Sequence, residues 1–173
     1  MFNPFRKTYS SQERATFEFL SKNHFFAPLE DHEKAEFLPF MYLRKYQKNE
    51  AVFFRGDPSQ AFYLIKKGAV SLNIDVEDKF ENLVKLREGD SFGDNALMDS
   101  AYRIYNAICV SEGCELYVIP TTNIQEIFED NVNIKAKMMY AMAEYFDRYF
   151  ASLFKAYKES FGFFDLGRAF SRK

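Results

Sequence analysis

The sequence contains no tryptophan and only two cysteines and two histidines among its 173 residues. Cys109 and Cys114 match none of the usual zinc-ligand spacings, and a zinc site would also require His24 or His32. We therefore expect no metal site. We favour two buried free thiols in a reducing compartment, with a disulfide between neighbouring strands as the alternative.

Long apolar runs and long basic runs are also missing. No apolar stretch approaches the roughly 18 residues that a membrane span needs, and the first residues lack the apolar core of a signal peptide. The 23 basic residues are scattered among 25 acidic ones, for a formal net charge of -2. We therefore expect a cytoplasmic protein with no membrane association and no strong attraction to nucleic acid.

Sequence signatures of catalysis are likewise absent. The chain has no Gly-x-Ser-x-Gly motif, no phosphate-binding loop ending in Gly-Lys-Ser/Thr, and no cysteine–histidine arrangement suggestive of a nucleophile. His24 and His32 both fall in the N-terminal helical region, where a structural or solvated role is the simpler interpretation. We expect no enzyme, no catalytic residue and no cofactor.

Phenylalanine and tyrosine are abundant instead, at 21 and 11 residues, and hydrophobic residues make up 47% of the chain. This composition supports one folded domain across residues 1–173 and argues against disorder over most of its length. Phenylalanine contributes the largest purely apolar surface to a core. So many in one small domain indicate that some of them face a partner.

Helices are predicted near the N-terminus, over residues 10–40. Ser10, followed three residues later by a glutamate, forms a capping box, so the first helix begins there and runs to about Lys22. Asp31 is expected to cap a second short helix that ends near Pro39. Apolar residues three or four apart in both helices indicate packing faces.

Short β-type runs separated by turn residues occupy residues 43–119. Short strands at this spacing are typical of an antiparallel β-barrel or jelly roll. We therefore predict a mainly β fold, in which the barrel is flanked by N-terminal helices and a long C-terminal helix. The predicted runs are 51–54, 61–65, 69–74, 83–86, 107–110 and 116–119.

Residues 120–160 are predicted to form C-terminal helices. Thr122 with Gln125 makes a second capping box for a short helix, and a long helix then runs from about Val132 to Ser160. No recognition-helix pattern follows in the remaining 13 residues. We therefore expect no helix-turn-helix module.

The long helix carries two apolar stripes, which require two covering surfaces. We expect the barrel on one side and the same helix of a second copy on the other, giving a homodimer. The alternative is that the Phe-rich tail, residues 161–173, folds back over the second stripe. The first stripe is Met139, Met142, Phe146, Tyr149, Leu153 and Ala156, and the second is Ile134, Met138, Ala141, Tyr145, Phe150, Phe154 and Tyr157.

The stretch that points to a ligand runs from Gly89 to Arg103. A glycine turn leads to a short helix beginning near Asp94, and free N–H groups at such an N-terminus attract anions. Gly93 lets the backbone come close to a ligand. Arg103 offers a planar fork suited to phosphate, and Asp94 offers an acceptor for a sugar hydroxyl.

Here the chain resembles the cyclic nucleotide-binding domain family, seen in catabolite activator protein and protein kinase A regulatory subunits. The family's phosphate-binding cassette reads Phe-Gly-Glu-x-Ala-Leu-apolar, followed after a short gap by an arginine. This chain has Phe92-Gly93-Asp94-Asn95-Ala96-Leu97-Met98 and then Arg103 at the family spacing, within a cassette of residues 92–106. The order of helices, barrel, short helix and long helix also agrees.

The resemblance implies a ligand, cyclic AMP or cyclic GMP or another anionic small molecule. Arg103 would hold the cyclic phosphate, Asp94 would bind the ribose hydroxyl, and the backbone of the next two residues would cap the phosphate. Binding would shift the long helix and pass a signal to an unidentified protein partner, so we expect a stand-alone regulatory or sensor domain. The implied ligand-binding residues are Gly93, Asp94, Asn95, Ala96, Arg103, Ile104, Tyr105 and Asn106.

The chain also departs from the family pattern. Asp94 is one methylene shorter than the family's glutamate, and Ile104 and Tyr105 stand where small or hydroxyl residues are usual. A bulge near Arg103 would aim Tyr105 outward and leave the pocket open, whereas without a bulge its ring would fill the phosphate space. The alternative function is therefore a ligand-free scaffold or interaction domain, in which Arg103 and Asp94 pair with each other.

Overall fold

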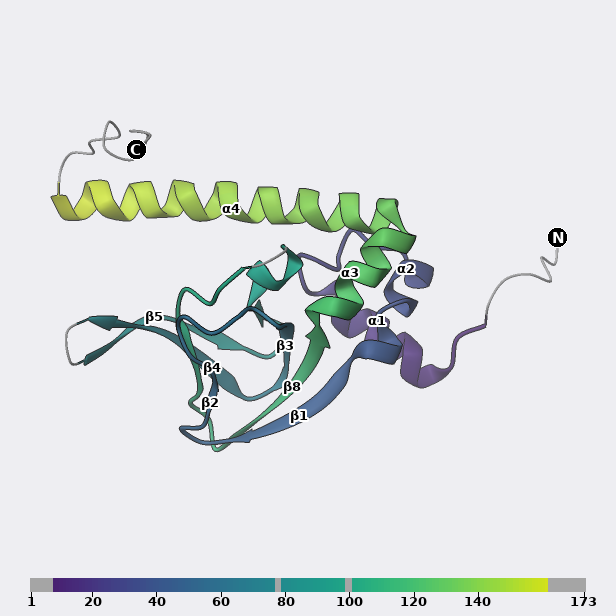
Figure 1. The fold of residues 1–173 in the computed structure, drawn as a ribbon, viewed down its shortest axis with the longest axis horizontal. Helices are drawn as coiled ribbons and strands as arrows, with labels where there is room; N and C mark the ends of the chain where they lie inside the picture. Colours follow the sequence, from purple (N-terminus) through teal and green to yellow (C-terminus); the bar gives the residue numbers. More distant parts are fainter. Residues whose placement is uncertain (1–7, 77–78, 99–100, 162–173) are drawn as a thin grey trace.

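The computed structural model describes residues 8–76, 79–98 and 101–161 of the chain. N-terminal helices come first, a β-barrel follows, and a long helix closes the molecule (Figure 1). The helices are α1 (Ser11–Ser21), α2 (Asp31–Ala35), η1 (Leu38–Phe40), η2 (Asp94–Leu97), α3 (Thr121–Asp130) and α4 (Val132–Phe161). The strands are β1 (Tyr42–Gln47), β2 (Ala51–Phe53), β3 (Ala61–Lys67), β4 (Ala69–Val76), β5 (Lys79–Arg87), β6 (Ser91–Phe92), β7 (Asn106–Cys109) and β8 (Gly113–Pro120).

The strands form two antiparallel four-stranded sheets, ordered β1-β8-β3-β6 and β2-β7-β4-β5. This arrangement confirms the predicted antiparallel barrel of jelly-roll type between helices. Strands β1 and the two-residue β6 were not predicted, and β5 begins four residues before the predicted run. The solvent-exposed β1 carries no buried residue, so its sequence lacks the apolar alternation that reveals a strand.

Strand β3 separates two hydrophobic cores. Its first five residues are all buried, and successive side chains of a strand point to opposite faces. Tyr63 and Ile65 pack inside the barrel, whereas Phe62 and Leu64 pack against the helices. The strand therefore holds the cassette side of the barrel against the helical layer.

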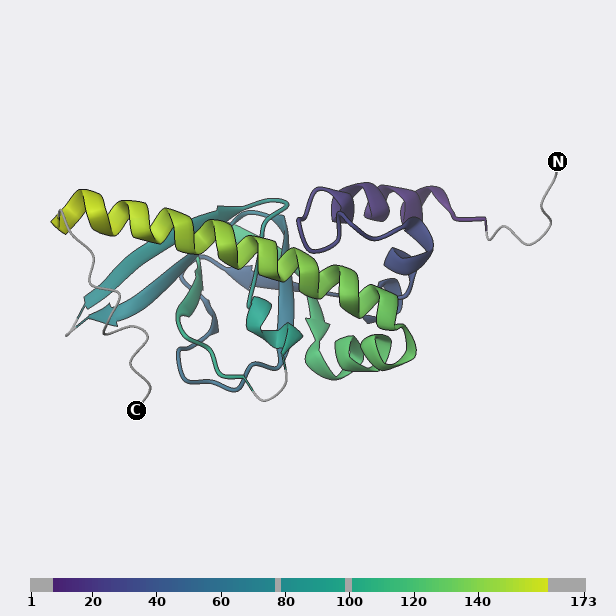
Figure 2. The ribbon, with the colours of Figure 1, turned by 90° about the horizontal axis from the view of Figure 1, so that it is seen from above.

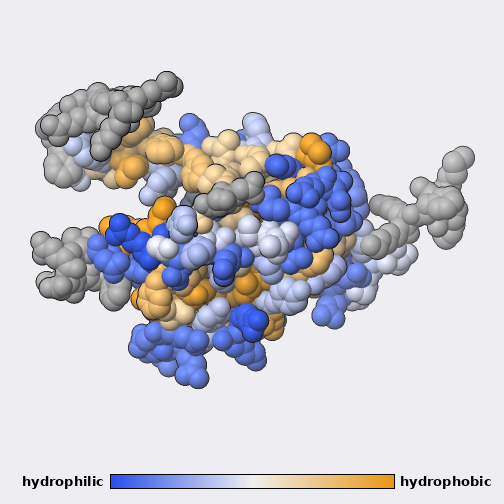
Figure 3. All heavy atoms as spheres, in the orientation of Figure 1, coloured by the Kyte–Doolittle hydropathy of each residue, from blue (hydrophilic) through white to orange (hydrophobic). Residues whose placement is uncertain are grey.

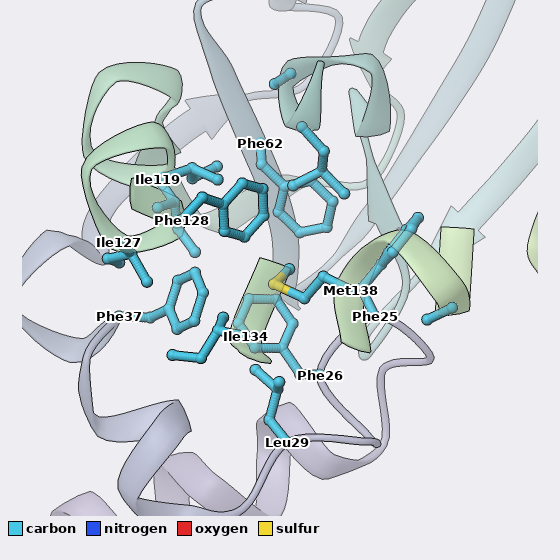
Figure 4. Packing of buried hydrophobic residues seen from close by; sticks show 14 of the residues in the cluster. Phe25, Phe26, Leu29, Phe37, Phe62, Ile119, Ile127, Phe128, Ile134 and Met138 are labelled. Atoms are coloured by element: carbon cyan, nitrogen blue, oxygen red, sulfur yellow. The ribbon is translucent and has the colours of Figure 1, made fainter. Parts of the chain in front are cut away.

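The helical core is built mainly from phenylalanine, isoleucine and leucine side chains that come from distant parts of the chain (Figure 4). Phe25 meets Phe62 edge to face with ring centroids 5.5 Å apart, and Phe26 meets Phe37 in the same way at 5.0 Å. Such aromatic pairs add about 0.5–1.5 kcal/mol to the burial of their surface. The abundant phenylalanines therefore join the N-terminal segment to the barrel.

The helix starts agree only in part with the prediction. Ser10 caps α1 through the expected capping box. The residue that caps α2 is Glu30 rather than Asp31, and α2 ends at Ala35, before the proline predicted to end it. The N-cap of α3 is Pro120 rather than Thr122.

The predicted capping role of Gln125 is also wrong. Its side-chain amide instead donates to the carbonyl of Leu97, 3.3 Å away in η2, and Thr121 Oγ1 donates to the carbonyl of Ser59 at 3.1 Å. A tertiary contact with η2 thus takes the Gln125 side chain that was predicted to cap the helix.

Cys109 and Cys114 form a disulfide, which corrects the preferred prediction of two free thiols. They belong to β7 and β8, which lie in different sheets, and their Cα atoms are 6.1 Å apart. Both side chains are buried in the barrel core. The short turn between the strands carries the chain from one sheet to the other and brings the two side chains together.

Helix α4 begins on the helical core and continues across the barrel (Figures 1 and 2). Ile134, Met138, Ala141 and Met142 in its first half are buried. Among residues 147–160, all but Tyr157 are exposed. Figure 3 shows hydrophobic side chains along this half of the helix. None of the helices in the described part of the chain is long and apolar enough to cross a membrane.

Candidate ligand-binding cassette

Gly93 is the turn between β6 and η2, and its backbone φ of 72° lies in the left-handed region that favours glycine. A Cβ atom here would lie 2.5 Å from Nη1 of Arg103 and 3.2 Å from the carbonyl oxygen of Ala61. The position therefore requires glycine both for its conformation and for the close approach of the arginine.

Arg103 is buried, with 4% of its surface exposed. Its Nη1 donates to the carbonyl of Gly93 at 3.2 Å and to Oδ1 of Asn95 at 3.0 Å, and its Nη2 donates to the carbonyl of Ala61 at 2.6 Å. The guanidinium carbon lies 4.2 Å from the centroid of the Phe53 ring, a cation–π distance. These contacts fix the guanidinium against the cassette turn.

Arg103 forms no ion pair with a carboxylate of the described residues, so the Arg103–Asp94 pair of the scaffold alternative is absent. Its Nε is also buried without a hydrogen-bond partner. Burial lowers the pKa of the guanidinium, while the charges of nearby phenols and of Asp94 act in the opposite direction. A buried cation whose N–H donor has no partner destabilises the folded protein unless an anion or another acceptor binds to it.

Tyr105 points inward, toward the cassette turn. Its hydroxyl accepts a hydrogen bond from the backbone N–H of Gly93 at 3.1 Å and donates to Oδ1 of Asp94 at 3.4 Å. Its ring centroid lies 5.9 Å from that of Phe53. Of the two arrangements compatible with the sequence, the structure has the one in which the ring fills space beside Arg103.

Asp94 lies in a partly buried position beneath α4. Burial raises the pKa of its carboxyl group, and the hydrogen bond from Tyr105 and the charge of Arg103 oppose this shift. Burial also raises the pKa of the Tyr145 phenol of α4, and the charge of Asp94 adds to that effect. The Tyr145 ring stacks on the ring of His24, with the ring centroids 4.6 Å apart.

Five of the eight residues implied by the resemblance meet at this turn. They are Gly93, Asp94, Asn95, Arg103 and Tyr105.

The side chains of the other three residues lie elsewhere. The backbone N–H of Ala96 donates to the carbonyl of Gly93 at 2.9 Å, but its side chain lies in the helical core. Ile104 is 70% exposed. Asn106 is buried, where its Oδ1 accepts a hydrogen bond from the N–H of Arg55 at 2.8 Å and its amide contacts Asp75. It thereby anchors the loop after β2.

Several site residues were not found from the sequence. Phe53 and Tyr63 form the aromatic wall beside Arg103, and the charge of Asp94 contributes to the raised pKa of Tyr145 in α4. Phe53 and Tyr63 lie in strands with ordinary β patterns, so nothing local distinguishes them from core residues. The only signal for Tyr145 was its place in the second apolar stripe of the long helix.

Residues 43–131, a little over half of the chain, match the family described as "Cyclic nucleotide-binding domain". The chain belongs to the cyclic nucleotide-binding domain family. The cassette geometry just described lies entirely within the matched part of this cyclic nucleotide-binding domain.

Relatives of the domain include regulators of several kinds. It is 30% identical to a global nitrogen regulator of Nostoc sp., covering 54% of this chain and 43% of that protein. It is 33% identical to a cAMP-dependent protein kinase regulatory subunit of Mycosarcoma maydis, covering 54% of this chain and 18% of that protein. The chain thus spans less than half the length of these curated relatives.

Solved structures share the fold at lower identity. The regulatory domain of Toxoplasma gondii PKA with cAMP matches with a TM-score of 0.63 at 19% identity, covering 70% of this chain and 46% of that one. Catabolite activator protein of Thermus thermophilus matches with a TM-score of 0.66 at 23% identity, covering 78% and 63%. These structures support the barrel-and-helix architecture of the domain.

Two cavities of this domain lie away from the cassette. One of about 470 Å³ lies at the barrel end beside Gly68 and Cys114, and one of about 500 Å³ lies beside Arg14 and Asp31. No cluster of three or more histidine, cysteine, aspartate or glutamate side chains suited to a metal occurs in the described part of the chain. Neither cavity contains a residue of the cassette.

Proposed function

We propose that this domain is a regulatory module that binds a cyclic nucleotide, or another small anion, at Arg103. The observation that carries the proposal is the buried guanidinium, which has an unpartnered Nε and forms no ion pair with a carboxylate of the described residues. Membership of the cyclic nucleotide-binding domain family supports a nucleotide as the anion. Cyclic AMP and cyclic GMP are the first ligands to test.

The donors of Arg103 are divided between the protein and the ligand in this proposal. An arginine has five N–H donors. Three of those of Arg103 serve Gly93, Asn95 and Ala61, and the guanidinium also hydrogen-bonds to the phenol of Tyr63. The Nε donor, which has no partner among the described residues, would bind the phosphate, because charge-assisted bonds of this kind are strong. Asp94 would accept a hydrogen bond from the sugar hydroxyl.

Helix α4 would carry the signal. Tyr145 connects it to the cassette through the charge of Asp94 and to the N-terminal segment through its stacking on His24. A ligand that changes the charge and contacts at Asp94 would shift the population of α4 positions, provided that it binds those positions with different affinity. The receiver would be a partner protein or a second copy of the chain.

The second half of α4 supports a homodimer. Four apolar side chains here are between 41% and 53% exposed: Tyr149, Phe150, Leu153 and Phe154. Full burial of such a side chain contributes about 1.5–3 kcal/mol relative to leaving it in water. The same helix of a second copy would cover them around a two-fold axis. We define these four residues as the α4 apolar strip.

The binding proposal is tested by thermal unfolding and calorimetry of the full chain with cyclic AMP and cyclic GMP. Ligand at 100 times its dissociation constant stabilises by about 2.7 kcal/mol, which raises Tm by about 5–11 °C for a domain of this size. Arg103→Lys should remove the shift, because lysine lacks the planar fork. Arg44→Ala, at an exposed position in β1, should keep it. A flat response of the parent protein to both nucleotides, with no binding heat, would reject nucleotide binding and favour a ligand-free scaffold.

A further inference from the structure

We propose that Tyr105 is a tethered competitor of the ligand, which holds the cassette in the ligand-free state and sets how tightly nucleotides bind. The inference rests on the proposed function, because it assumes that a small anion binds at Arg103. It assigns to Tyr105 the role of a specificity-determining residue whose hydroxyl must leave before the ligand enters.

Tyr105 already makes two contacts that a ligand would make. Its hydroxyl receives the N–H of Gly93 and donates to the carboxylate of Asp94, the residue proposed to accept the sugar hydroxyl. The carbonyl of the same Gly93 accepts from Arg103. One glycine residue thus connects the phenol to the proposed phosphate-binding group.

The ring of Tyr105 shares its support with Arg103. Both side chains lie beside Phe53, the guanidinium carbon at 4.2 Å and the tyrosine ring at 5.9 Å from its centroid. A ligand that approaches the guanidinium of Arg103 from the side of Phe53 therefore meets the ring of Tyr105. Entry requires the ring to move.

The backbone around Tyr105 is held in place on both sides. The N–H of Arg103 donates to the carbonyl of Asp57 at 2.8 Å, and its carbonyl accepts from the N–H of Gly56 at 2.9 Å. Asn106 is buried at 2% exposure and bonded to the N–H of Arg55. Release of the ring is therefore a rotation of the side chain, not a movement of the loop.

Displacement of Tyr105 selects for a ligand of a particular kind. When the hydroxyl leaves, the partly buried carboxylate of Asp94 loses its donor, and the N–H of Gly93 loses its acceptor. A ligand with only an anionic group satisfies Arg103 but leaves Asp94 without a donor. A cyclic nucleotide with a free 2′-hydroxyl supplies both groups, so it displaces the tyrosine at the lowest cost.

The experiment measures the affinity and the association rate constant of cyclic AMP and 2′-deoxy cyclic AMP for the full chain and its variants. Tyr105→Phe removes the hydroxyl contacts but keeps the ring, so cyclic AMP should bind about 2- to 12-fold more tightly. The gain should appear in the association rate constant, because a larger fraction of the protein is ready to bind. Tyr105→Ala should bind at least as tightly, and 2′-deoxy cyclic AMP should bind every form about 10- to 150-fold more weakly than cyclic AMP.

Tyr102→Phe is the matched control, because Tyr102 lies in the same loop with its side chain 64% exposed. Its affinity for cyclic AMP should equal that of the parent protein. Equal or weaker binding by Tyr105→Phe would overturn the role of Tyr105 and leave the proposed function intact. Failure of the parent and of both Tyr105 variants to bind cyclic AMP would overturn the inference together with cyclic AMP binding. Binding by the Tyr105 variants alone would support the inference most strongly.

Discussion

The ammonium group of Lys137 in α4 donates to both carboxylate oxygens of Glu33 in α2, at 2.8 and 2.7 Å. Glu33 is 4% exposed. Burial raises the pKa of its carboxyl group, but the hydrogen bonds from Lys137 and from the N–H of Glu30 outweigh burial and leave that pKa below its usual value. The pair joins the N-terminal helices to the helix that crosses the barrel.

Replacement of Lys137 by methionine should lower the free energy of unfolding by about 1.5–3 kcal/mol, because it breaks a charged hydrogen bond and leaves Glu33 buried. Denaturant unfolding measures the change. The double variant Glu33→Gln with Lys137→Met should recover part of the loss, since no unpaired charge remains. Lys155→Met is the control, because it breaks only the exposed Lys155–Glu159 pair, and it should change stability by less than about 0.5 kcal/mol. Equal effects of the two single variants would contradict a structural role for the buried pair.

Replacement of Gly93 by alanine should destabilise the domain and displace Arg103. The left-handed backbone alone costs about 1–2 kcal/mol for alanine, and the new Cβ would lie 2.5 Å from Nη1 of Arg103. Gly89→Ala is a matched control, since Gly89 has a φ of 89° with open space around its Cβ position. Thermal unfolding should show a larger fall for Gly93→Ala than for Gly89→Ala. Equal decreases in Tm for the two variants would show that the Arg103 side chain moves aside without loss of stability.

The stability of the domain should fall in acid because of His24. Burial and, to a smaller extent, the charge of Arg148 lower the pKa of His24 from 6.5 to about 4, against the opposing charge of Asp90. Between these two pH values the unfolded chain binds a proton that the folded chain does not. The free energy of unfolding therefore has its full value above about pH 6.5 and falls as the pH is lowered toward 4. The loss is below about 3.4 kcal/mol, because solvent screens the partly exposed imidazole.

Unfolding curves of the parent protein and of His24→Phe between pH 4 and 8 test this assignment. The difference in unfolding free energy between the two should narrow or reverse as the pH falls, because phenylalanine keeps the stacking and cannot take a proton. His32, whose side chain is 66% exposed, supplies the control His32→Gln. A constant difference between parent and His24→Phe across this range would refute the assignment.

The α4 apolar strip should hold two copies together. Leu153→Asp should dissociate the dimer, because it places a charge among apolar side chains. Ser152→Asp, the neighbouring position on another face of the helix, should leave it intact. Sedimentation at tens of micromolar protein measures the outcome. A full chain that stays monomeric, while a chain ending at Ser160 associates, would show instead that the Phe-rich tail covers the strip.

The sequence alone determined the architecture of the domain. The change from helical spacing to short β runs at residue 43, the turn glycines and the return of helical spacing after residue 120 specified a barrel between helices. These features are local, because backbone periodicity decides which residues share a face. The capping box at Ser10 was readable for the same reason, since both of its hydrogen bonds join residues three apart. The cassette motif also identified the residues that meet at Gly93.

Only the tertiary structure decided how the cassette residues are arranged. The direction of Tyr105, the wall that Phe53 gives to Arg103 and the link from Asp94 to Tyr145 all depend on segments far apart in the chain. The pairing of the two cysteines and the capping of α3 by Pro120 were decided in the same way. Packing and long-range hydrogen bonds outweigh the local preferences of the chain, and residue spacing in the sequence does not reveal these long-range contacts. The sequence therefore located the cassette, and the packing of strands and helices around it determined which groups meet there.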